Sequence, residues 1–295
     1  MHDPPVLAVV GDLLEDVVVW SPGPLRLATD NPSVIHRCRG GSAANVAEFA
    51  AGLVSTRFIG RVGDDPLGAS LCGQLTAAGV DVRVQRVGRT GCIVVVVDVD
   101  GERTMFPDRG ASAELRDVPE EWINGISGLH LTAYTIATAD SEKTAVALLS
   151  SARARGAVTS VDASSTTTLR EYGVDRFREL VRDLRPSILF ANADEARLLD
   201  LHASDATPET TVVIKDGARP TTVIDARGTT RTPVPPIPEI RDTTGAGDAF
   251  AAGYLAAVLG GAPSEEAVAG AHRLAAQVLA TPGAQTAAPT TREVM

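Results

Sequence analysis

The residues best suited to chemistry lie in segment 242–250, which has the sequence Asp-Thr-Thr-Gly-Ala-Gly-Asp-Ala-Phe and leads into an alanine-rich stretch. Gly245 and Gly247, on either side of Ala246, let the backbone approach a ligand closely. A helix that begins here directs unpaired N–H groups and the positive end of its dipole towards the same point. The segment therefore predicts an anion hole.

Asp248 lies in this predicted anion hole, where a carboxylate would repel a phosphate group. A carboxylate in this position is useful only if it takes up a proton during the reaction. The pattern therefore indicates a general base beside a phosphoryl group in transfer. An ordinary glycine turn with Asp248 as a helix cap is the alternative.

Short apolar runs indicate the scaffold that must position these residues. They occur at 6–10, 129–132, 158–161, 188–190 and 212–214. Runs of this kind are typical of strands buried in a parallel sheet, and they alternate with segments of helical spacing such as 143–154 and 176–184. We expect a mostly parallel sheet with helices on both faces, and two further helices at about 246–259 and 265–280.

Two pairs of β-rich runs in the N-terminal third have no helical segment between their members. Residues 17–20 and 34–36 form one pair, and residues 92–99 and 103–106 form the other, around Asp100-Gly101. An Asp-Gly dipeptide between such runs is typical of a tight hairpin. We expect a small separate sheet, covering about 17–36 and 82–107, that acts as a lid or pairs with a second subunit. An antiparallel extension of the main sheet is the alternative.

Three separated motifs make the sequence similar to the ribokinase/PfkB carbohydrate kinase family. Segment 242–250 matches the family's C-terminal signature, segment 40–47 (Gly-Gly-Ser-Ala-Ala-Asn-Val-Ala) matches its N-terminal signature, and segment 59–68 resembles the family too. The resemblance implies one α/β domain over residues 1–295, a ribokinase-like three-layer sandwich with a mostly parallel central sheet and a small β lid. It also implies an ATP-dependent kinase that phosphorylates a hydroxyl of a sugar, sugar acid or nucleoside.

The same resemblance implies an acceptor site formed by Asp16, Gly40, Gly41, Ser42 and Asn45. Two glycines ahead of a helix let substrate hydroxyls reach the backbone, and an asparagine can donate and accept at once, as a sugar diol requires. Ser42 as a helix cap, Asn45 as a buried polar residue and Asp16 as a solvated loop acid are the alternatives. Arg109, where the family often contributes a substrate contact, could bind an anionic group of the acceptor. Arg103 lies in the same lid region.

Nucleotide binding is implied for Asn192, Lys215, Gly217 and His272. Lys215 stands where the family usually has threonine and could supply a point charge to the ATP phosphates. The loop also departs from the family pattern at residue 220, where proline replaces a glycine. In Asn192-Ala-Asp-Glu195 a spacing of three residues places both side chains on one face of a helical turn, and the resemblance implies that Glu195 holds Mg²⁺.

A monovalent cation such as K⁺ is the third ligand that the resemblance implies. In the family it is held largely by backbone carbonyls close to the anion hole. The matching positions are Asp242, Thr244, Val278, Thr281, Gly283 and Ala287.

Composition excludes several other classes of protein. The formal net charge of −10 argues against a nucleic-acid partner, because phosphate backbones are bound by surplus Lys and Arg. The three cysteines, at 38, 72 and 92, have no zinc-type spacing and are expected to be reduced thiols. Residues 1–10 lack the features of a secretory signal, and no apolar run approaches the ~20 residues of a membrane span. These features predict a cytoplasmic protein, and we expect it to be a homodimer that pairs through the lid.

Two other functions are alternatives to phosphoryl transfer. A nucleotide- or metabolite-sensing protein of the same fold would explain the changes at Pro220 and His272, although the intact Asp248 argues against it. A Rossmann-type oxidoreductase is excluded because no Gly-x-Gly-x-x-Gly follows the first predicted strand. The sequence also lacks a Gly-x-x-x-x-Gly-Lys-Ser/Thr loop, which excludes P-loop kinases.

Overall fold

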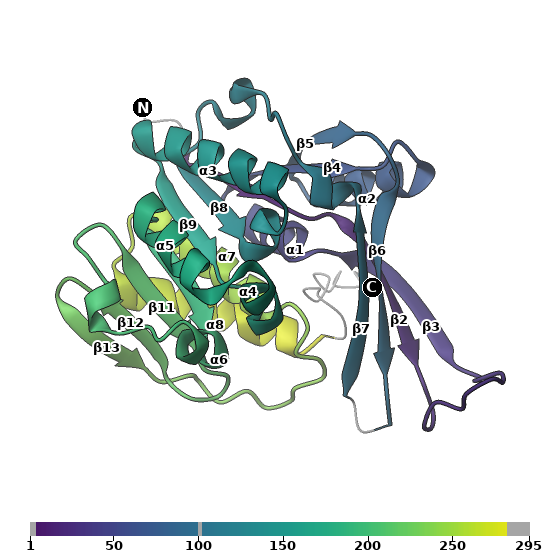
Figure 1. Ribbon diagram of the computed structural model, residues 1–295. Coiled ribbons are helices and arrows are strands. Elements are labelled where there is room, and N and C mark those ends of the chain that lie inside the picture. Colours follow the sequence, from purple (N-terminus) through teal and green to yellow (C-terminus); the bar gives the residue numbers. More distant parts are fainter. Residues whose placement is uncertain (1–3, 100–101, 282–295) are drawn as a thin grey trace, which may run out of the picture.

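Short apolar segments form the buried strands of a nine-stranded sheet, as their composition predicts. The computed structural model describes residues 4–99 and 102–281 (Figure 1). The strand order is β13-β12-β11-β10-β9-β8-β1-β4-β5. Neighbouring strands from β11 to β5 run parallel, whereas β12 and β13 are antiparallel. The strands are β1 (Val6–Val10), β4 (Ser55–Val62), β5 (Asp81–Arg86), β8 (Gly128–Thr132), β9 (Val158–Asp162), β10 (Ile188–Asn192), β11 (Thr211–Lys215), β12 (Thr221–Asp225) and β13 (Gly228–Thr232).

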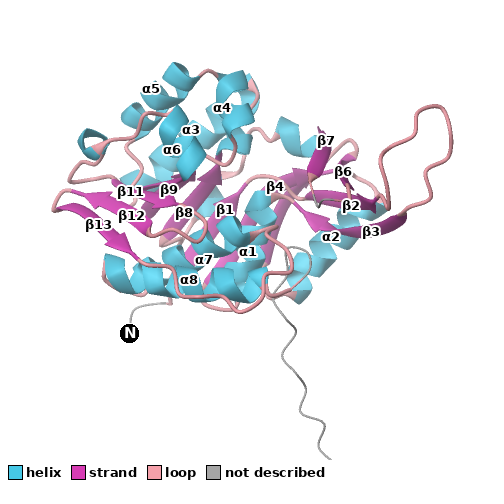
Figure 2. Cartoon of the chain, turned by 90° about the horizontal axis from the view of Figure 1, so that it is seen from below, coloured by secondary structure: helices cyan, strands magenta, loops and turns pink. Residues whose placement is uncertain are grey.

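Helices cover both faces of this sheet, which confirms the expected three-layer architecture (Figure 2). One face packs against α1 (Ser42–Ala51), α2 (Pro66–Ala77), α7 (Ala246–Leu259) and α8 (Ser264–Leu279). The other face packs against α3 (Ala139–Ala154), α4 (Thr166–Tyr172), α5 (Val174–Leu184) and α6 (Ala193–Leu198). Single turns of 3₁₀ helix lie at η1 (Ala111–Glu114), η2 (Glu120–Ile123), η3 (Ala133–Ile136) and η4 (Ala203–Asp205).

The strand order reverses at β1, which lies between β4 and β8. The chain first moves from β1 to β4 and β5 in one direction, and then from β8 to β11 in the other. In open α/β sheets, ligands bind outside the carboxyl ends of the strands at such a reversal. The residues that leave the ends of β1, β8, β9, β10 and β11 are therefore those expected to line a site.

A second, four-stranded sheet projects from the main one, which confirms the separate sheet that the sequence predicted (Figure 1). Its order is β3-β2-β6-β7, with β2 (Leu14–Trp20), β3 (Val34–Gly40), β6 (Thr90–Val97) and β7 (Arg103–Gly110). Antiparallel pairing of β6 with β7 agrees with a hairpin there, although residues 100 and 101 of its turn lie outside the described residues.

The boundaries expected for this small sheet need correction. Residues 82–86 belong to β5, which pairs in parallel with β4 over Arg57–Val62 at the edge of the main sheet. Val82 and Val84 pack against the main hydrophobic core, and this burial holds the strand there. The small sheet also extends beyond 17 and 36, to Leu14 and Gly40, so its strands themselves carry residues of the predicted acceptor site.

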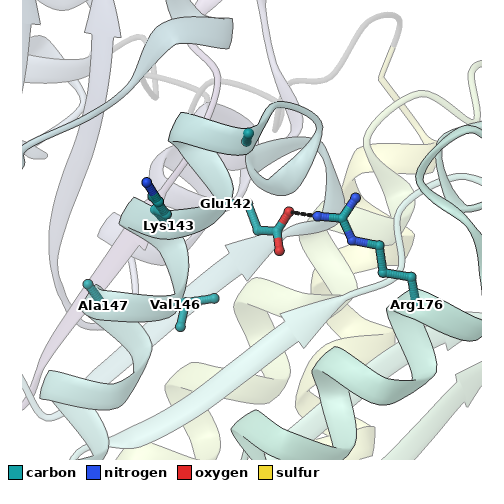
Figure 3. A pocket seen from close by; sticks show the side chains of 6 residues that line it. Glu142, Lys143, Val146, Ala147 and Arg176 are labelled. Carbon is teal, nitrogen blue, oxygen red and sulfur yellow. Dashed lines mark hydrogen bonds and ion pairs between the residues drawn. The ribbon is translucent and has the colours of Figure 1, made fainter.

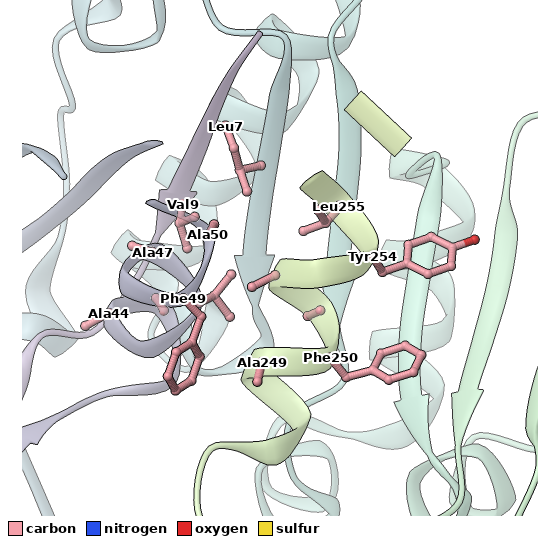
Figure 4. Close-up of a cluster of buried hydrophobic side chains, with 14 of the residues drawn as sticks. Leu7, Val9, Ala44, Ala47, Phe49, Ala50, Ala249, Phe250, Tyr254 and Leu255 are labelled. Carbon is pink, nitrogen blue, oxygen red and sulfur yellow. The ribbon is translucent and has the colours of Figure 1, made fainter. Parts of the chain in front are cut away.

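Helices α1 and α7 lie side by side beneath β1 (Figure 4). Alanines dominate the contact, and Phe49 and Phe250 fill the space around them. Small side chains let the two helix axes approach closely, which brings the first turns of both helices to the same end of the sheet.

None of the helices within residues 4–99 and 102–281 has both the length and the apolar character needed to cross a membrane.

A buried histidine lies in the middle of the main sheet. His130 in β8 is fully buried, and its Nδ1 lies 2.9 Å from Ser160 Oγ. Its Nε2 has no hydrogen-bond partner among the described residues. Burial disfavours the charged imidazolium and lowers the pKa of His130 to about 4.

We expect His130 to make folding less stable in acid. In the unfolded chain it takes up a proton near its ordinary pKa of about 6.5, whereas the folded protein resists protonation until about pH 4. Its contribution to stability is therefore complete above about pH 6.5 and is lost as the pH falls towards 4. Between pH 7 and pH 5 the wild type should lose about 2 kcal/mol more unfolding free energy than His130→Gln, measured by urea denaturation. His36→Gln, at an exposed position, is the matched control and should lose as much unfolding free energy as the wild type. An equally large loss in His130→Gln would contradict the prediction.

Candidate active site

Asp248, the predicted base, lies in the first turn of α7 and is held by the first turn of α1. Gly245 caps α7 in the left-handed conformation (φ 77°), which glycine adopts without strain. Ser42 Oγ donates to Asp248 Oδ1 at 2.6 Å, and Asn45 Nδ2 donates to Asp248 Oδ2 at 2.9 Å. The two signature segments of the sequence therefore meet at this one carboxylate.

The surroundings of Asp248 make it more basic than an ordinary aspartate. Burial raises its pKa to about 6, and the hydrogen bonds from Ser42 and Asn45 oppose that rise. Asp162 adds a further upward shift, while Lys215 acts in the opposite direction. At neutral pH the group is still ionised, and its pKa is close to the value that favours proton transfer.

Asp16 lies beside this carboxylate, on β2 of the small sheet. Its Oδ1 is buried and has no hydrogen-bond partner among the described residues. Burial raises the pKa of Asp16 to about 6; Arg39 lowers it and Asp248 raises it. An ionised carboxylate oxygen without a donor is suited to accept a hydrogen bond from a ligand hydroxyl.

Gly40 and Gly41 make room for the aspartates of this region. A Cβ on Gly40 would lie 2.3 Å from Asp16 Oδ1, and a Cβ on Gly41 would lie 2.3 Å from the carbonyl oxygen of Asp12. Gly41 also has a φ of 101° as the cap of α1. A side chain at Gly40 would displace the Asp16 carboxylate, and a side chain at Gly41 would displace the turn at Asp12.

Asn45 has a narrower role than the sequence suggested. Its Oδ1 accepts a hydrogen bond of 2.9 Å from Arg39 Nη1, so the amide presents its N–H₂ group to Asp248. Arg39 is buried at the end of β3 and also pairs with Glu48 of α1. Simultaneous donation and acceptance towards a sugar, the expectation from sequence, is therefore limited by Arg39.

Lys215 extends from the end of β11 towards the predicted anion hole. Its Nζ lies 2.7 Å from Asp162 Oδ2 and 3.5 Å from the position that a Cβ on Gly247 would occupy. Burial alone would lower the pKa of Lys215, but the ion pair with Asp162 outweighs it and the pKa is raised. The ammonium group is therefore a fixed positive charge next to the glycine loop.

Asn192 and Glu195 form a capping box at the start of α6. Glu195 Oε2 accepts from the Asn192 backbone N–H at 2.8 Å, and Asn192 Oδ1 accepts from the Glu195 N–H at 2.9 Å. Glu195 is almost completely buried; burial, and then the charge of Asp162, raise its pKa to about 7.

These carboxylates fit a hard divalent cation. Glu195 and Asp162 provide oxygen ligands of the kind that Mg²⁺ prefers, and their mutual repulsion leaves the cluster short of positive charge. The described residues contain no group of three or more His, Cys, Asp or Glu side chains already arranged around a metal position.

The predicted monovalent-cation segment also touches the small sheet. Arg103 of β7 contacts both Asp242 and Thr244, just ahead of Gly245. Asp242 and Leu279 are neighbours through an N–H to O contact of 3.4 Å, which brings the two predicted cation-binding segments together. Gly283 and Ala287 lie outside the described residues.

Arg109 is held by a carboxylate of its own chain. It forms two hydrogen bonds with Asp12, at 2.7 and 2.6 Å, at the point where β1 ends. The pair joins the small sheet to the main sheet. A direct contact between Arg109 and the acceptor stays a prediction.

Two further residues that were predicted to bind the nucleotide lie near the start of β12 or on the loop before it. His272 of α8 is buried, with Nε2 2.8 Å from Thr221 Oγ1 and its ring against Phe250. The His272 ring is therefore held between β12 and α7. Gly217 is exposed, with a φ of 58°. Their roles in nucleotide binding remain predictions.

Sequence reasoning missed Asp162, Tyr134 and Arg39. Asp162 ends a buried strand at the edge where a site was expected, so its position could have identified it. Tyr134 follows β8 in the same way; burial raises its pKa to about 12, and the charge of Asp248 adds to that shift. Arg39 gave no such signal, because nothing in a run of alternating β residues indicates a buried cation.

A pocket on the outer helical layer is unrelated to these residues (Figure 3). It lies over α3 and α5 and is lined by Ala139, Glu142, Lys143, Val146, Ala147 and Arg176. Arg176 pairs with Glu142 at 2.5 Å across it and stacks on Tyr172. None of the predicted site residues lines this pocket.

Comparisons with known proteins point to one family. The model of the pfkB family carbohydrate kinases matches residues 6–291. An ATP-dependent ribose-1-phosphate kinase of Halopiger xanaduensis is 33% identical over 84% of this chain and 82% of its own. A fructokinase of Klebsiella pneumoniae is 32% identical over 78% and 80%.

Solved structures share the fold at lower identity. An adenosine kinase from Sinorhizobium meliloti superposes with a TM-score of 0.84 at 23% identity, covering 97% of both chains. A putative ribokinase II from E. coli, in complex with ATP and Mg²⁺, has a TM-score of 0.82 at 20% identity, covering 95% and 94%. Both confirm the ribokinase-like architecture. With the family match over nearly its whole length, the chain belongs to the pfkB family of carbohydrate kinases.

Proposed function

We propose that this kinase transfers the γ-phosphoryl group of ATP to a hydroxyl of a sugar, sugar acid or nucleoside, with Asp248 as the general base. The acceptor oxygen forms a bond to the γ-phosphorus while the bond to the bridging oxygen of ADP breaks. The hydroxyl proton passes to Asp248.

One observation carries this proposal: Asp248 receives hydrogen bonds from both Ser42 and Asn45 at the mouth of the glycine loop. The carboxylate is therefore fixed between the acceptor segment at 40–45 and the backbone N–H groups that begin α7. A group held there reaches the acceptor hydroxyl and the transferring phosphoryl group together. As a mere cap of α7, Asp248 would not need two donors from another helix.

We assign acceptor binding to Asp16, Gly40, Gly41, Ser42 and Asn45. The unpartnered Oδ1 of Asp16 supports a hydrogen bond from an acceptor hydroxyl. Glycines at positions 40 and 41 let the Asp16 carboxylate and the turn at Asp12 lie close to the backbone that leads into Ser42 and Asn45.

We assign the nucleotide to the side of Asp248 that faces Lys215. The ammonium group beside Gly247 favours the phosphates, and Gly217, Asn192 and His272 lie on the segments that continue from there. Mg²⁺ held through Glu195 would neutralise phosphate charge. K⁺ near Asp242 and Thr244 is a further proposed ligand.

We also propose a cytoplasmic homodimer that pairs through the outer face of the small sheet. On this face Val19 pairs with Ile35 and Val96, and Val94 pairs with Phe106. Ile35 and Phe106 are 59% and 57% exposed, and the half-buried Val19, Val94 and Val96 lie on the strands between them. The opposite face carries Asp16 and Arg103, which points it towards the active site.

Asp248→Asn should abolish most turnover and leave the fold intact. Asparagine has nearly the same shape but is a very poor base, so kcat should fall by roughly two to four orders of magnitude. ATP affinity should be unchanged or slightly higher, because a negative charge near the γ-phosphate is removed. A coupled assay of ADP formation over a panel of sugars, sugar acids and nucleosides measures the first effect, and calorimetry the second.

The control for that variant is Asp175→Asn, which changes a carboxylate in the first turn of α5. It should behave as the wild type. Near-normal kcat in Asp248→Asn, or a loss explained by unfolding, would remove Asp248 from the role of base. A wild type that turns over no acceptor of the panel would favour the sensing protein instead.

Asp16→Ala should weaken acceptor binding without changing the KM for ATP. Loss of a charge-assisted hydrogen bond of about 1.5–3 kcal/mol corresponds to roughly a 10- to 150-fold rise in acceptor KM. Asn45→Ala should raise acceptor KM too and also lower kcat, because it removes a donor from Asp248. Glu15→Gln, on the opposite face of β2, is the control. An unchanged acceptor KM in both alanine variants would exclude these residues from the site.

Phe106→Asp should convert the proposed dimer to a monomer, because the charge would be desolvated in an apolar interface. Light scattering coupled to size-exclusion chromatography measures the mass. Leu53→Asp, at another exposed apolar side chain outside the small sheet, should remain dimeric. A monomeric wild type would contradict the proposed homodimer.

A further inference from the structure

Arg39 is a buried cation next to the active site that the proposed reaction does not use. It ends β3, and its side chain is only 6% exposed. Burial of a guanidinium group is costly unless its N–H groups are satisfied, so such a residue is informative. Here Nη1 donates to Asn45 Oδ1 at 2.9 Å, and Nη2 pairs with Glu48.

The partners of Arg39 lie on one face of α1. Asn45 and Glu48 are three residues apart, so a single guanidinium group can contact both. The Asn45 amide then reaches Asp248, which makes a continuous chain of contacts from Glu48 through Arg39 and Asn45 to the proposed base.

The chemistry of this chain fixes the orientation of an amide. A guanidinium group can only donate hydrogen bonds, so it requires the oxygen of Asn45 on its side. The N–H₂ group of Asn45 must then face Asp248. When Asp248 gains the acceptor's proton, it could itself donate to an amide turned the other way. Arg39 opposes that rotation, since its N–H would then face another N–H.

We propose that Arg39 is a positioning residue that keeps Asn45 a hydrogen-bond donor to Asp248 throughout the reaction. The inference rests on the proposed function, since it takes Asp248 as the proton acceptor. By keeping this donor in place, Arg39 stabilises the ionised form of the base. It also lies close enough to Asp16 to stabilise the charge of that carboxylate.

Other charged and polar groups also face Asp248 and Arg39. The test must separate their effects on Asp248 from the effect of Arg39. Asp248 is faced by Ser42 and Asn45 of α1, Asp162 of β9, Lys215 of β11, Asp16 of β2 and Tyr134 of η3. Arg39 is faced by Asp16, Cys38, Asn45 and Glu48. A change that acts through Asn45 leaves the charges of Asp162 and Lys215 in place.

Two variants test the proposal. Arg39→Lys keeps a positive charge for Glu48 but lacks the fork that reaches Asn45 as well. The double change of Arg39→Met with Glu48→Met removes both partners of the ion pair, so that no charge is left buried alone. Arg37→Met is the matched control, because Arg37 is on the same strand and the same face but is 68% exposed.

The readouts are the pH profile of kcat/KM and the pKa of Asp248 itself. In both Arg39 variants we expect kcat/KM to fall about tenfold and its acidic limb to move up by about half to one pH unit. The Arg37 variant should match the wild type. Carbon-13 NMR of aspartate-labelled protein, assigned with Asp248→Asn, should show the same upward shift in the pKa of Asp248 without any turnover.

The NMR measurement separates failure of this inference from failure of the proposed function. A shifted Asp248 pKa in a protein that phosphorylates no acceptor would support the positioning role and overturn the proposed reaction. An unchanged Asp248 pKa and an unchanged acidic limb in the folded Arg39 variants would overturn the positioning role, even if thermal stability falls.

Discussion

The hydrogen bonds from Ser42 and Asn45 to Asp248 are the contact on which the rest of the site depends. They require the first turns of α1 and α7 to lie at one point, and the alanine-rich packing of these helices under β1 brings them there. Asp16 and Gly40, which we propose for acceptor binding, lie on one side of the carboxylate, on the small sheet. The residues that we propose for phosphate binding lie on the other side, at the ends of β9 to β11.

Around this point, positive and negative side chains are matched in specific pairs. Lys215 pairs with Asp162, Arg109 with Asp12, and Arg103 with Asp242. The two arginine pairs cross between the small sheet and the body of the protein, so the small sheet is joined to the site electrostatically as well as through the chain. Movement of the small sheet would therefore change the surroundings of the glycine loop directly.

Much of the fold could be predicted because local patterns and tertiary structure agree. The apolar run at 6–10 forms β1, and the helix expected at 246–259 has those bounds in the structure. The separate sheet followed from strands without a helix between them. The predicted boundary at residue 82 was wrong. Val82 and Val84 have the alternation expected of a strand in either sheet, and only their burial against the main core places them in the main sheet.

The candidate site could be predicted only in part. Glycines and the residues of known motifs are visible in the sequence, and the structure brings Asp16, Ser42, Asn45 and Asp248 together. Partnerships between side chains are not visible. Arg109 and Lys215 were expected to face ligands, yet each contacts a carboxylate of the chain, and Arg39 became evident only from its burial.

The packing of α7 against α1 also has a consequence for synthesis of the chain on the ribosome. The N-terminal half carries β1, α1 and β4, but α1 also packs against α7, which lies near the end of the described chain. Until α7 emerges, this part of the core lacks Ala249, Phe250, Tyr254 and Leu255, the side chains of α7 labelled in Figure 4. The nascent protein must therefore carry an open core through most of translation, a period in which aggregation competes with folding and a chaperone would be of use.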